Sequence, residues 1–195
     1  RSLLAKGVRK RYGIGCHDLM HAARVVGLIH DLGKLQSGWQ AWAEAVETSL
    51  DPHYAAERPL AHTSGMHQVT PSKPRHALQG SYLAIRLLTE NLRNKWPEDL
   101  MLAVITAVAA HHGGWVYPDA AIQQLCAKAE AEIRRMIECV PSNWELVQFA
   151  DFIKYIDKCI THADNILRHW PLTSLLTRVL RLSDQDATKE GGLNE

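Results

Sequence analysis

Apolar residues recur at intervals of three and four along most of the chain, which predicts helices almost throughout. The clearest run begins at Asp18, and its apolar positions are Leu19, Ala22, Ala23, Val26, Ile29 and Leu32. Gly33 follows this run and is a typical helix stop. A second helix is predicted over 38–48, with Trp39, Trp42 and Val46 on one side.

Further along the chain, the same spacing predicts helices over 76–93, 98–110, 119–140, 144–169 and 172–182. The stretch 98–110 is almost wholly apolar and is the candidate central helix. Four prolines and Gly65 predict a long irregular loop over 51–75, and we expect a frayed tail over 183–195. Alternation typical of β-strands is absent from the sequence, so the fold class is predicted to be an all-α helical bundle.

Length and composition favour one globular domain over residues 1–195. A hydrophobic share of 46% with 22% charged residues is typical of globular proteins and argues against a disordered chain. A net charge of +1 gives no overall attraction to nucleic acid or to a membrane, so contact with phosphate would need local patches or bound metal. The chain starts with Arg1 rather than Met, which fits a fragment of a longer protein.

The four cysteines are scattered and form no C-x-x-C pair, which argues against a zinc ribbon or a disulfide framework. Reduced thiols predict a cytoplasmic location. No run approaches the roughly 20 apolar residues needed to cross a bilayer, so we expect no membrane partner.

Three groups among the eleven histidines stand at predicted helix ends. His30 and Asp31 open the segment H-D-L-G-K, His76 begins the helix after the long loop, and the pair His111–His112 ends the most apolar helix. Because helix ends from distant parts of a chain can converge, we expect these side chains to share a pocket.

A late acidic residue is the remaining ligand candidate. Asp164 lies at the inward edge of an apolar helical stripe, four residues after Ile160, where an unpaired carboxylate would be unfavourable. Asp157 lies on nearly the same face and is the alternative.

These residue types suit metal chemistry. Neutral imidazoles bind divalent metals at roughly 2.0–2.1 Å, and a carboxylate such as Asp31 can bridge two ions. Two ions about 3.5–4 Å apart can activate water and stabilise the leaving oxygen in phosphodiester hydrolysis. Lys34 is predicted to be catalytic with Asp31, its ammonium placed against a phosphate oxygen. The alternative is that Lys34 only stabilises a helix end.

Nucleic-acid contacts are predicted beside the histidine pair. Gly113 and Gly114 would let a substrate backbone approach closely, and Trp115 could stack on an unpaired base. Core packing is the alternative for the tryptophans. The N-terminal segment contains a basic cluster, which would either follow a phosphate backbone or be a solvated segment: Lys6, Arg9, Lys10 and Arg11. Three histidines of the long loop would either line a substrate path or be ordinary loop residues: His53, His62 and His67.

The order of these motifs resembles the HD superfamily of metal-dependent phosphohydrolases. It is most similar to the HD nuclease domain of CRISPR interference systems, which occurs in the type I helicase–nuclease and in a stand-alone form. That family shows H-D-x-G-K, a lone His, His-His-Gly and a late Ala-Asp, in the order found here over about 19–168. The resemblance implies one metal site from Asp31, His76, His111 and His112, and most of a second from His30, Asp31 and Asp164.

One family feature is missing from the sequence. The first metal-binding histidine of the family usually lies on a helix well upstream, but only 29 residues precede His30. His21 lies nine residues before His30, about half a turn round the helix, and His17 is little better. Three explanations stay open: the helix has been cut away, the order is permuted, or the site uses one metal.

The resemblance implies a metal-dependent nuclease that cleaves single-stranded DNA in antiviral defence. Its implied partners are a helicase domain or subunit and an RNA-guided surveillance complex. Its implied cofactors are divalent ions, two in number, from among Mn, Ni, Co, Fe and Mg. The alternatives are an HD phosphohydrolase of nucleotides or cyclic dinucleotides and a non-catalytic helical scaffold.

Overall fold

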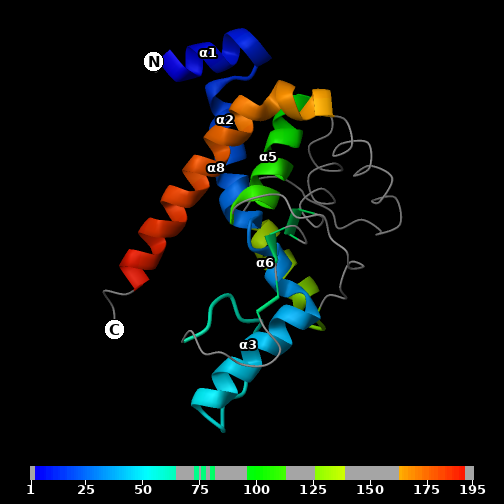
Figure 1. The fold of residues 1–195 in the computed structure, drawn as a ribbon, viewed down its shortest axis with the longest axis vertical. Coiled ribbons are helices and arrows are strands. Elements are labelled where there is room, and N and C mark those ends of the chain that lie inside the picture. The colour runs from blue at the N-terminus through cyan, green and yellow to red at the C-terminus, as the bar shows by residue number, and fades with distance from the viewer. Residues whose placement is uncertain are drawn as a thin grey trace.

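The computed structural model describes residues 3–64, 73–74, 76–77, 80–81, 96–112, 126–138 and 163–191. The elements in these ranges are α1 (Leu3–Tyr12), α2 (Cys16–Ile29), the short 3-10 helix η1 (Leu32–Leu35), α3 (Ser37–Leu50), α5 (Glu98–Ala110), α6 (Ala129–Glu138) and α8 (Ala163–Gly191). Figure 1 shows their arrangement, and no strand occurs in the part of the chain described. The predicted all-α fold is confirmed.

Helix α5 is the centre of the packing, as its apolar sequence predicts. Every residue from Leu100 to Val108 is buried. Helices α2 and α8 pack on α5 and on each other, as Figure 1 also shows. Full burial of an aliphatic side chain stabilises a protein by about 1.5–3 kcal/mol, so this three-helix contact stabilises the segments that lead into the histidines.

Helix α3 points away from that core and has a small core of its own. Its indole rings Trp39 and Trp42 are buried with Ala43 and Val46, and Leu60 of the following loop packs on them. The helix contacts η1, which directly precedes it. The predicted helix over 38–48 is therefore confirmed with slightly wider bounds, Ser37–Leu50.

Helix α8 differs from the prediction at two places. It runs without a break from Ala163 to Gly191. The sequence predicts one helix ending at residue 169, a separate helix starting at residue 172, and a frayed tail from Ser183. Pro171 lies inside α8, where proline normally breaks a helix because it has no N–H to donate to residue i−4 and its ring clashes with that carbonyl. The side chains of Leu172, Leu176 and Leu180 are buried in the core at helical spacing, so packing outweighs the local preference of proline.

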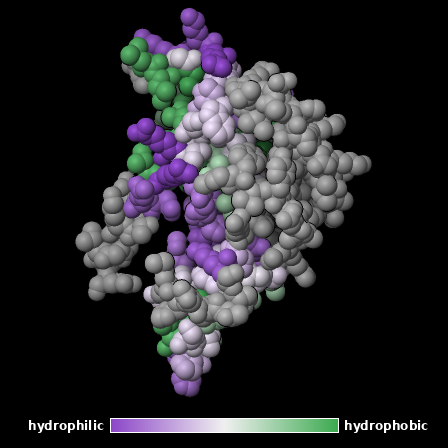
Figure 2. All heavy atoms as spheres, in the orientation of Figure 1, coloured by the Kyte–Doolittle hydropathy of each residue, from purple (hydrophilic) through white to green (hydrophobic). Residues whose placement is uncertain are grey.

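Two further differences concern the ends of elements. Helix α6 begins at Ala129, after a turn at 127–128, and residues 119–125 of the predicted helix lie outside the described part. The N-terminal segment is helical in α1, and its Leu3 is 85% exposed. Figure 2 shows hydrophobic colour at that end of the molecule, among hydrophilic residues.

The described part of the predicted loop, 51–64 and 73–74, contains no helix, as expected. It is held against α6 by Arg58, which donates two hydrogen bonds to Glu132 at 2.9 and 2.8 Å. Lys128 donates to the carbonyl oxygens of Ala56 and Glu57, both at 2.9 Å. The loop is therefore anchored to a helix more than seventy residues later in the chain. No described helix is long and apolar enough to cross a membrane.

Candidate metal centre

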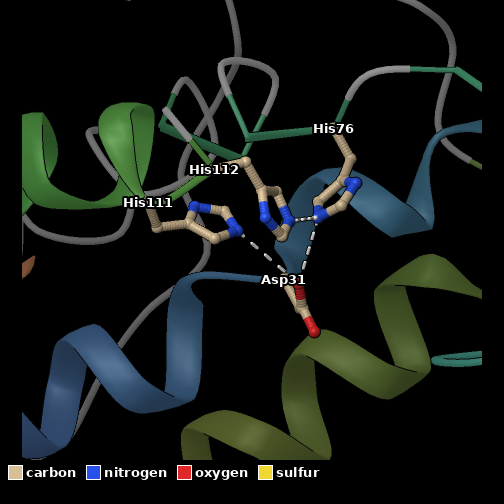
Figure 3. Close-up of side chains that lie close together, drawn as sticks. All are labelled: Asp31, His76, His111 and His112. Atoms are coloured by element: carbon tan, nitrogen blue, oxygen red, sulfur yellow. Dashed lines mark hydrogen bonds and ion pairs between the residues drawn. The ribbon is translucent and has the colours of Figure 1, made fainter. Parts of the chain in front are cut away.

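Four predicted ligands lie close together at the ends of three helical segments. Asp31 follows α2, His111 and His112 follow α5, and His76 directly precedes the helical residue Ala77. One ligand atom from each lies within 4.8 Å of the others. Figure 3 shows the four side chains pointing toward one another from separate elements. The packing of α2 on α5 brings Asp31 and His111 together, although 80 residues separate them in the sequence.

The distances between ligand atoms are those of a metal-binding group. Nε2 of His76 lies 3.2 Å from Oδ1 of Asp31 and 2.9 Å from Nε2 of His112. Nε2 of His111 lies 4.0 Å from the same carboxylate oxygen. Two ligands about 2.1 Å from an ion are about 3.0 Å apart at a right angle and about 3.4 Å apart at the tetrahedral angle. The short pairs match this spacing, and His111 would need a small approach.

The buried nitrogen of His111 gives an independent test of the fit. Its Nδ1–H donates to the carbonyl oxygen of Val108 at 2.6 Å, so the lone pair of the neutral ring is on Nε2. That Nε2 is buried and has no hydrogen-bond partner. A buried imidazole nitrogen without a partner is unfavourable unless something such as a cation is bound to it. The residues present therefore fit a divalent metal ion.

His76, His111 and His112 are held in the neutral form that metals require. Burial, together with the charge of the neighbouring His112, lowers the pKa of His111 to about 4. Burial also lowers the pKa of His76 despite its hydrogen bond to Asp31, and burial with the charge of His76 lowers that of His112. Neutral imidazole is the ligand form, so no proton has to be displaced from these rings at neutral pH.

Asp31 presents its two oxygens to two different sets of groups. Oδ1 faces His76 and His111, whereas Oδ2 lies 2.7 Å from Nζ of Lys34 and 3.3 Å from Nε2 of His30. Burial by itself would raise the pKa of Asp31, but hydrogen bonds from His30 and His76 and the charges of His30 and Lys34 lower it well below its usual range. The carboxylate is therefore ionised, with Oδ1 facing His76 and His111 and Oδ2 facing Lys34 and His30.

His30 lies beside the four-residue group. Its Nδ1–H donates to the carbonyl oxygen of Gly27 at 2.6 Å, which directs Nε2 to Oδ2 of Asp31. Burial lowers the pKa of His30, but the hydrogen bond and charge of Asp31 outweigh burial and raise it. Nε2 of His30 and Oδ2 of Asp31 therefore lie 3.3 Å apart, and the second ion predicted at this pair stays a prediction.

Lys34 is buried, with 8% of its surface exposed. Its ammonium donates to Oδ2 of Asp31 at 2.7 Å and to the carbonyl oxygen of Ala61 at 2.8 Å. Two of its three N–H bonds are thus directed at protein acceptors. Its predicted contact with a phosphate oxygen stays a prediction, and the contacts observed support a role in orienting Asp31.

Glycine is required on steric grounds at position 33 of the H-D-L-G-K segment. A β-carbon at Gly33 would collide with the carbonyl oxygen of His76 and would lie 2.6 Å from the backbone nitrogen of Gly80. A β-carbon at Gly80 would lie 3.1 Å from the carbonyl oxygen of His30. The turn after α2 and the segment that begins at His76 therefore touch backbone to backbone, which brings His76 close to Asp31.

The sequence did not predict two residues that support the centre. Arg181 of α8 donates from Nε to the carbonyl oxygen of His111 at 3.1 Å. It lies on the exposed face of the helix, where nothing in the sequence distinguishes it from other surface arginines. Gln40 is buried in α3, but it lies about 100° round the helix from Trp39 and away from the side formed with Trp42 and Val46, so no pattern in the sequence distinguished it.

Four of the predicted site residues cannot be placed. Gly113, Gly114 and Trp115 lie outside the described residues. Asp164 is in the first turn of α8, but its side chain is outside the described part of the chain. Their roles stay predictions.

Comparison with known proteins agrees with this geometry. A search of curated proteins found no match. The family model described as "Cas3, HD domain" matches residues 1–185, which is nearly the whole chain. The match includes the segments that carry Asp31, His76 and the pair His111–His112, and the chain therefore belongs to the Cas3 HD-domain family, the HD nuclease domain of Cas3-type CRISPR proteins.

Proposed function

We propose that this chain is a metal-dependent nuclease that hydrolyses phosphodiester bonds in single-stranded DNA during CRISPR interference. The observation that carries the proposal is the convergence of Asp31, His76, His111 and His112, whose ligand atoms lie within 4.8 Å of one another. Family membership supports a hydrolase of this class. The proposed partners are a helicase domain or subunit and an RNA-guided surveillance complex.

Each residue has a distinct part in the proposed site. His76, His111 and His112 would hold a divalent ion through Nε2, and Asp31 would hold it through Oδ1. His30, Oδ2 of Asp31 and Asp164 would hold a second ion. When bound, divalent ions lower the pKa of water and polarise a phosphoryl oxygen.

Substrate would reach this site from the side of His112. The rings of His76 and His111 are buried, whereas His112 is exposed. His112 is also followed directly by Gly113 and Gly114, for which we propose close contact with the substrate backbone, and Trp115 would stack on a base. The neutral imidazoles of His76, His111 and His112 and the ionised Asp31 would require no change of protonation before a metal binds. The pKa of His30 is raised, so His30 would have to lose its proton more readily with a metal at hand than without one.

The proposal is tested by loading metal-free protein with manganese, nickel or magnesium. Cleavage is then assayed on single-stranded DNA, duplex DNA and a panel of nucleotides, for the parent chain and for Asp31→Ala. A matched control is Asp51→Ala, because that carboxylate is exposed and accepts a hydrogen bond only from the backbone of His53 among the contacts described.

We expect cleavage of single strands that Asp31→Ala lowers more than about 100-fold and that Asp51→Ala leaves unchanged, since removal of a ligand is more severe than the 10–100-fold effect of an outer residue. Turnover of nucleotides without strand cleavage would contradict the nuclease and favour a nucleotide phosphohydrolase. Absence of activity with every metal would favour a non-catalytic scaffold.

A further inference from the structure

Gln40 makes three hydrogen bonds from a buried position in α3, where 5% of its surface is exposed. Its Nε2 donates to the carbonyl oxygen of Lys34 at 2.7 Å and to that of Leu60 at 2.9 Å. Its Oε1 accepts from the backbone N–H of Leu60 at 2.8 Å. One amide group therefore joins η1, α3 and the loop 51–64.

These contacts hold the backbone of Lys34 and the residue that precedes an acceptor of its ammonium. Gln40 holds the carbonyl of Lys34 itself, and it holds both backbone groups of Leu60. The next residue after Leu60 is Ala61, whose carbonyl oxygen accepts from Nζ of Lys34 at 2.8 Å. The same glutamine thus holds the lysine backbone directly, and it holds the acceptor of the lysine side chain through the neighbouring residue Leu60.

The Lys34 ammonium in turn reaches the metal centre. Nζ lies 2.7 Å from Oδ2 of Asp31 and 5.6 Å from the centre of the Trp39 ring, which is itself buried. With its stem packed and two acceptors fixed, Lys34 holds the Asp31 carboxylate so that Oδ1 is directed to His76 and His111. A continuous chain of contacts therefore runs from Gln40 through Lys34 to a metal ligand.

We propose that Gln40 is a positioning residue of the metal centre. It fixes Lys34 and the segment Leu60–Ala61, and through them it orients the Asp31 carboxylate toward the three histidines. This inference rests on the proposed metal site, since it assigns Gln40 an effect on metal affinity that a residue needed only for folding would not have.

Glu47 provides the comparison that separates positioning from simple attachment of the loop. It is also buried in α3, and it accepts hydrogen bonds from the backbone N–H and from Oγ of Ser64, the latter at 2.8 Å. Glu47 thus attaches the same loop to the same helix. None of its described contacts reaches Lys34 or Asp31.

The experiment compares Gln40→Met with Glu47→Met in the whole chain. Each substitution keeps an unbranched side chain of similar length and removes side-chain hydrogen bonds to the loop. Manganese affinity is measured by calorimetric titration, and the stability of the metal-free protein is measured by circular dichroism during urea unfolding. Asp31→Ala is titrated beside them.

We expect Gln40→Met to weaken manganese binding by about 10-fold or more, the range found for residues that orient metal ligands. We expect Glu47→Met to lower stability and leave manganese affinity unchanged. Equal weakening in both variants, or unchanged binding in Gln40→Met, would overturn the inference. If Gln40→Met does not fold, Gln40→Glu replaces it, because a carboxylate can still accept from Leu60 but cannot donate to the carbonyl of Lys34.

Failure of the proposed function gives a different result. If Asp31→Ala binds manganese as tightly as the parent, the metal centre itself is wrong and the role of Gln40 falls with it. If the parent binds manganese and Gln40→Met binds it weakly, but no strand is cleaved under any condition, the nuclease proposal fails while the positioning role of Gln40 stands.

Discussion

The backbone of Gly33 lies directly against the carbonyl group of His76, with no room for a β-carbon between them. This contact joins the turn that carries Asp31 to the segment that begins at His76, and the two side chains approach to 3.2 Å as a result. The fourth residue of H-D-L-G-K is therefore a packing requirement of the metal centre.

Gly33→Ala should destabilise the protein and weaken metal binding. The added methyl group would force apart two backbone segments, and such overpacking is unfavourable by about 1–3 kcal/mol. The control is Gly27→Ala in α2, where an added β-carbon meets nothing within 4 Å. Alanine in an exposed helix interior is more favourable than glycine by about 0.5–1 kcal/mol, so the control should be slightly stabilised. Urea unfolding and manganese titration measure both effects, and equal behaviour of the two variants would contradict the role of Gly33.

The metal-free protein should lose stability as the pH falls from about 7 to about 4.5. Burial lowers the pKa of His111 from 6.5 to about 4. In that window the unfolded chain takes up a proton that folded His111 does not, so the unfolding free energy decreases as pH falls, by an amount on the order of 2 kcal/mol. The raised pKa of His30 acts in the opposite direction and reduces the net effect.

The comparison for this pH dependence is His111→Gln. This variant lacks the titrating group and should show a shallower loss of stability over the same range, measured by urea unfolding at each pH without metal. An unchanged slope would mean that the acid sensitivity arises elsewhere.

Manganese should stabilise the parent chain against unfolding. A ligand that binds only the folded state at 100 times its Kd stabilises it by about 2.7 kcal/mol. The increase should disappear in His76→Ala, which removes the ligand lying 3.2 Å from Asp31, and it should persist in Asp51→Ala. Addition of a chelator should reverse the increase in the parent. Equal stabilisation of His76→Ala would show that manganese binds somewhere else.

The number of bound ions tests the predicted second site. We expect two manganese ions per parent chain and one in Asp164→Asn or in His30→Gln, because both side chains are predicted to bind only the second ion. Equilibrium dialysis with metal analysis gives the ratio, and Asp51→Ala should keep the parent value. One ion in the parent, unaffected by Asp164→Asn, would support the alternative of a single-metal centre.

Periodicity alone was sufficient for the helical class of the protein and for its central helix. The predicted span 98–110 coincides with α5, because a wholly apolar helix is stable only where it is buried on all sides. Local pattern was misleading at Pro171, since sequence rules weigh the missing hydrogen bond of proline and cannot weigh the burial of Leu172, Leu176 and Leu180.

The sequence by itself singled out Asp31, His76, His111 and His112 as candidate metal ligands, through residue chemistry and through a motif order that resembles the HD family. Only the tertiary structure decided that they lie within 4.8 Å of one another, that Lys34 faces Asp31 and Ala61, and that Gln40 supports this arrangement. The physical reason is that distances between segments far apart in the sequence depend on how helices and loops pack, which no local spacing in the sequence expresses.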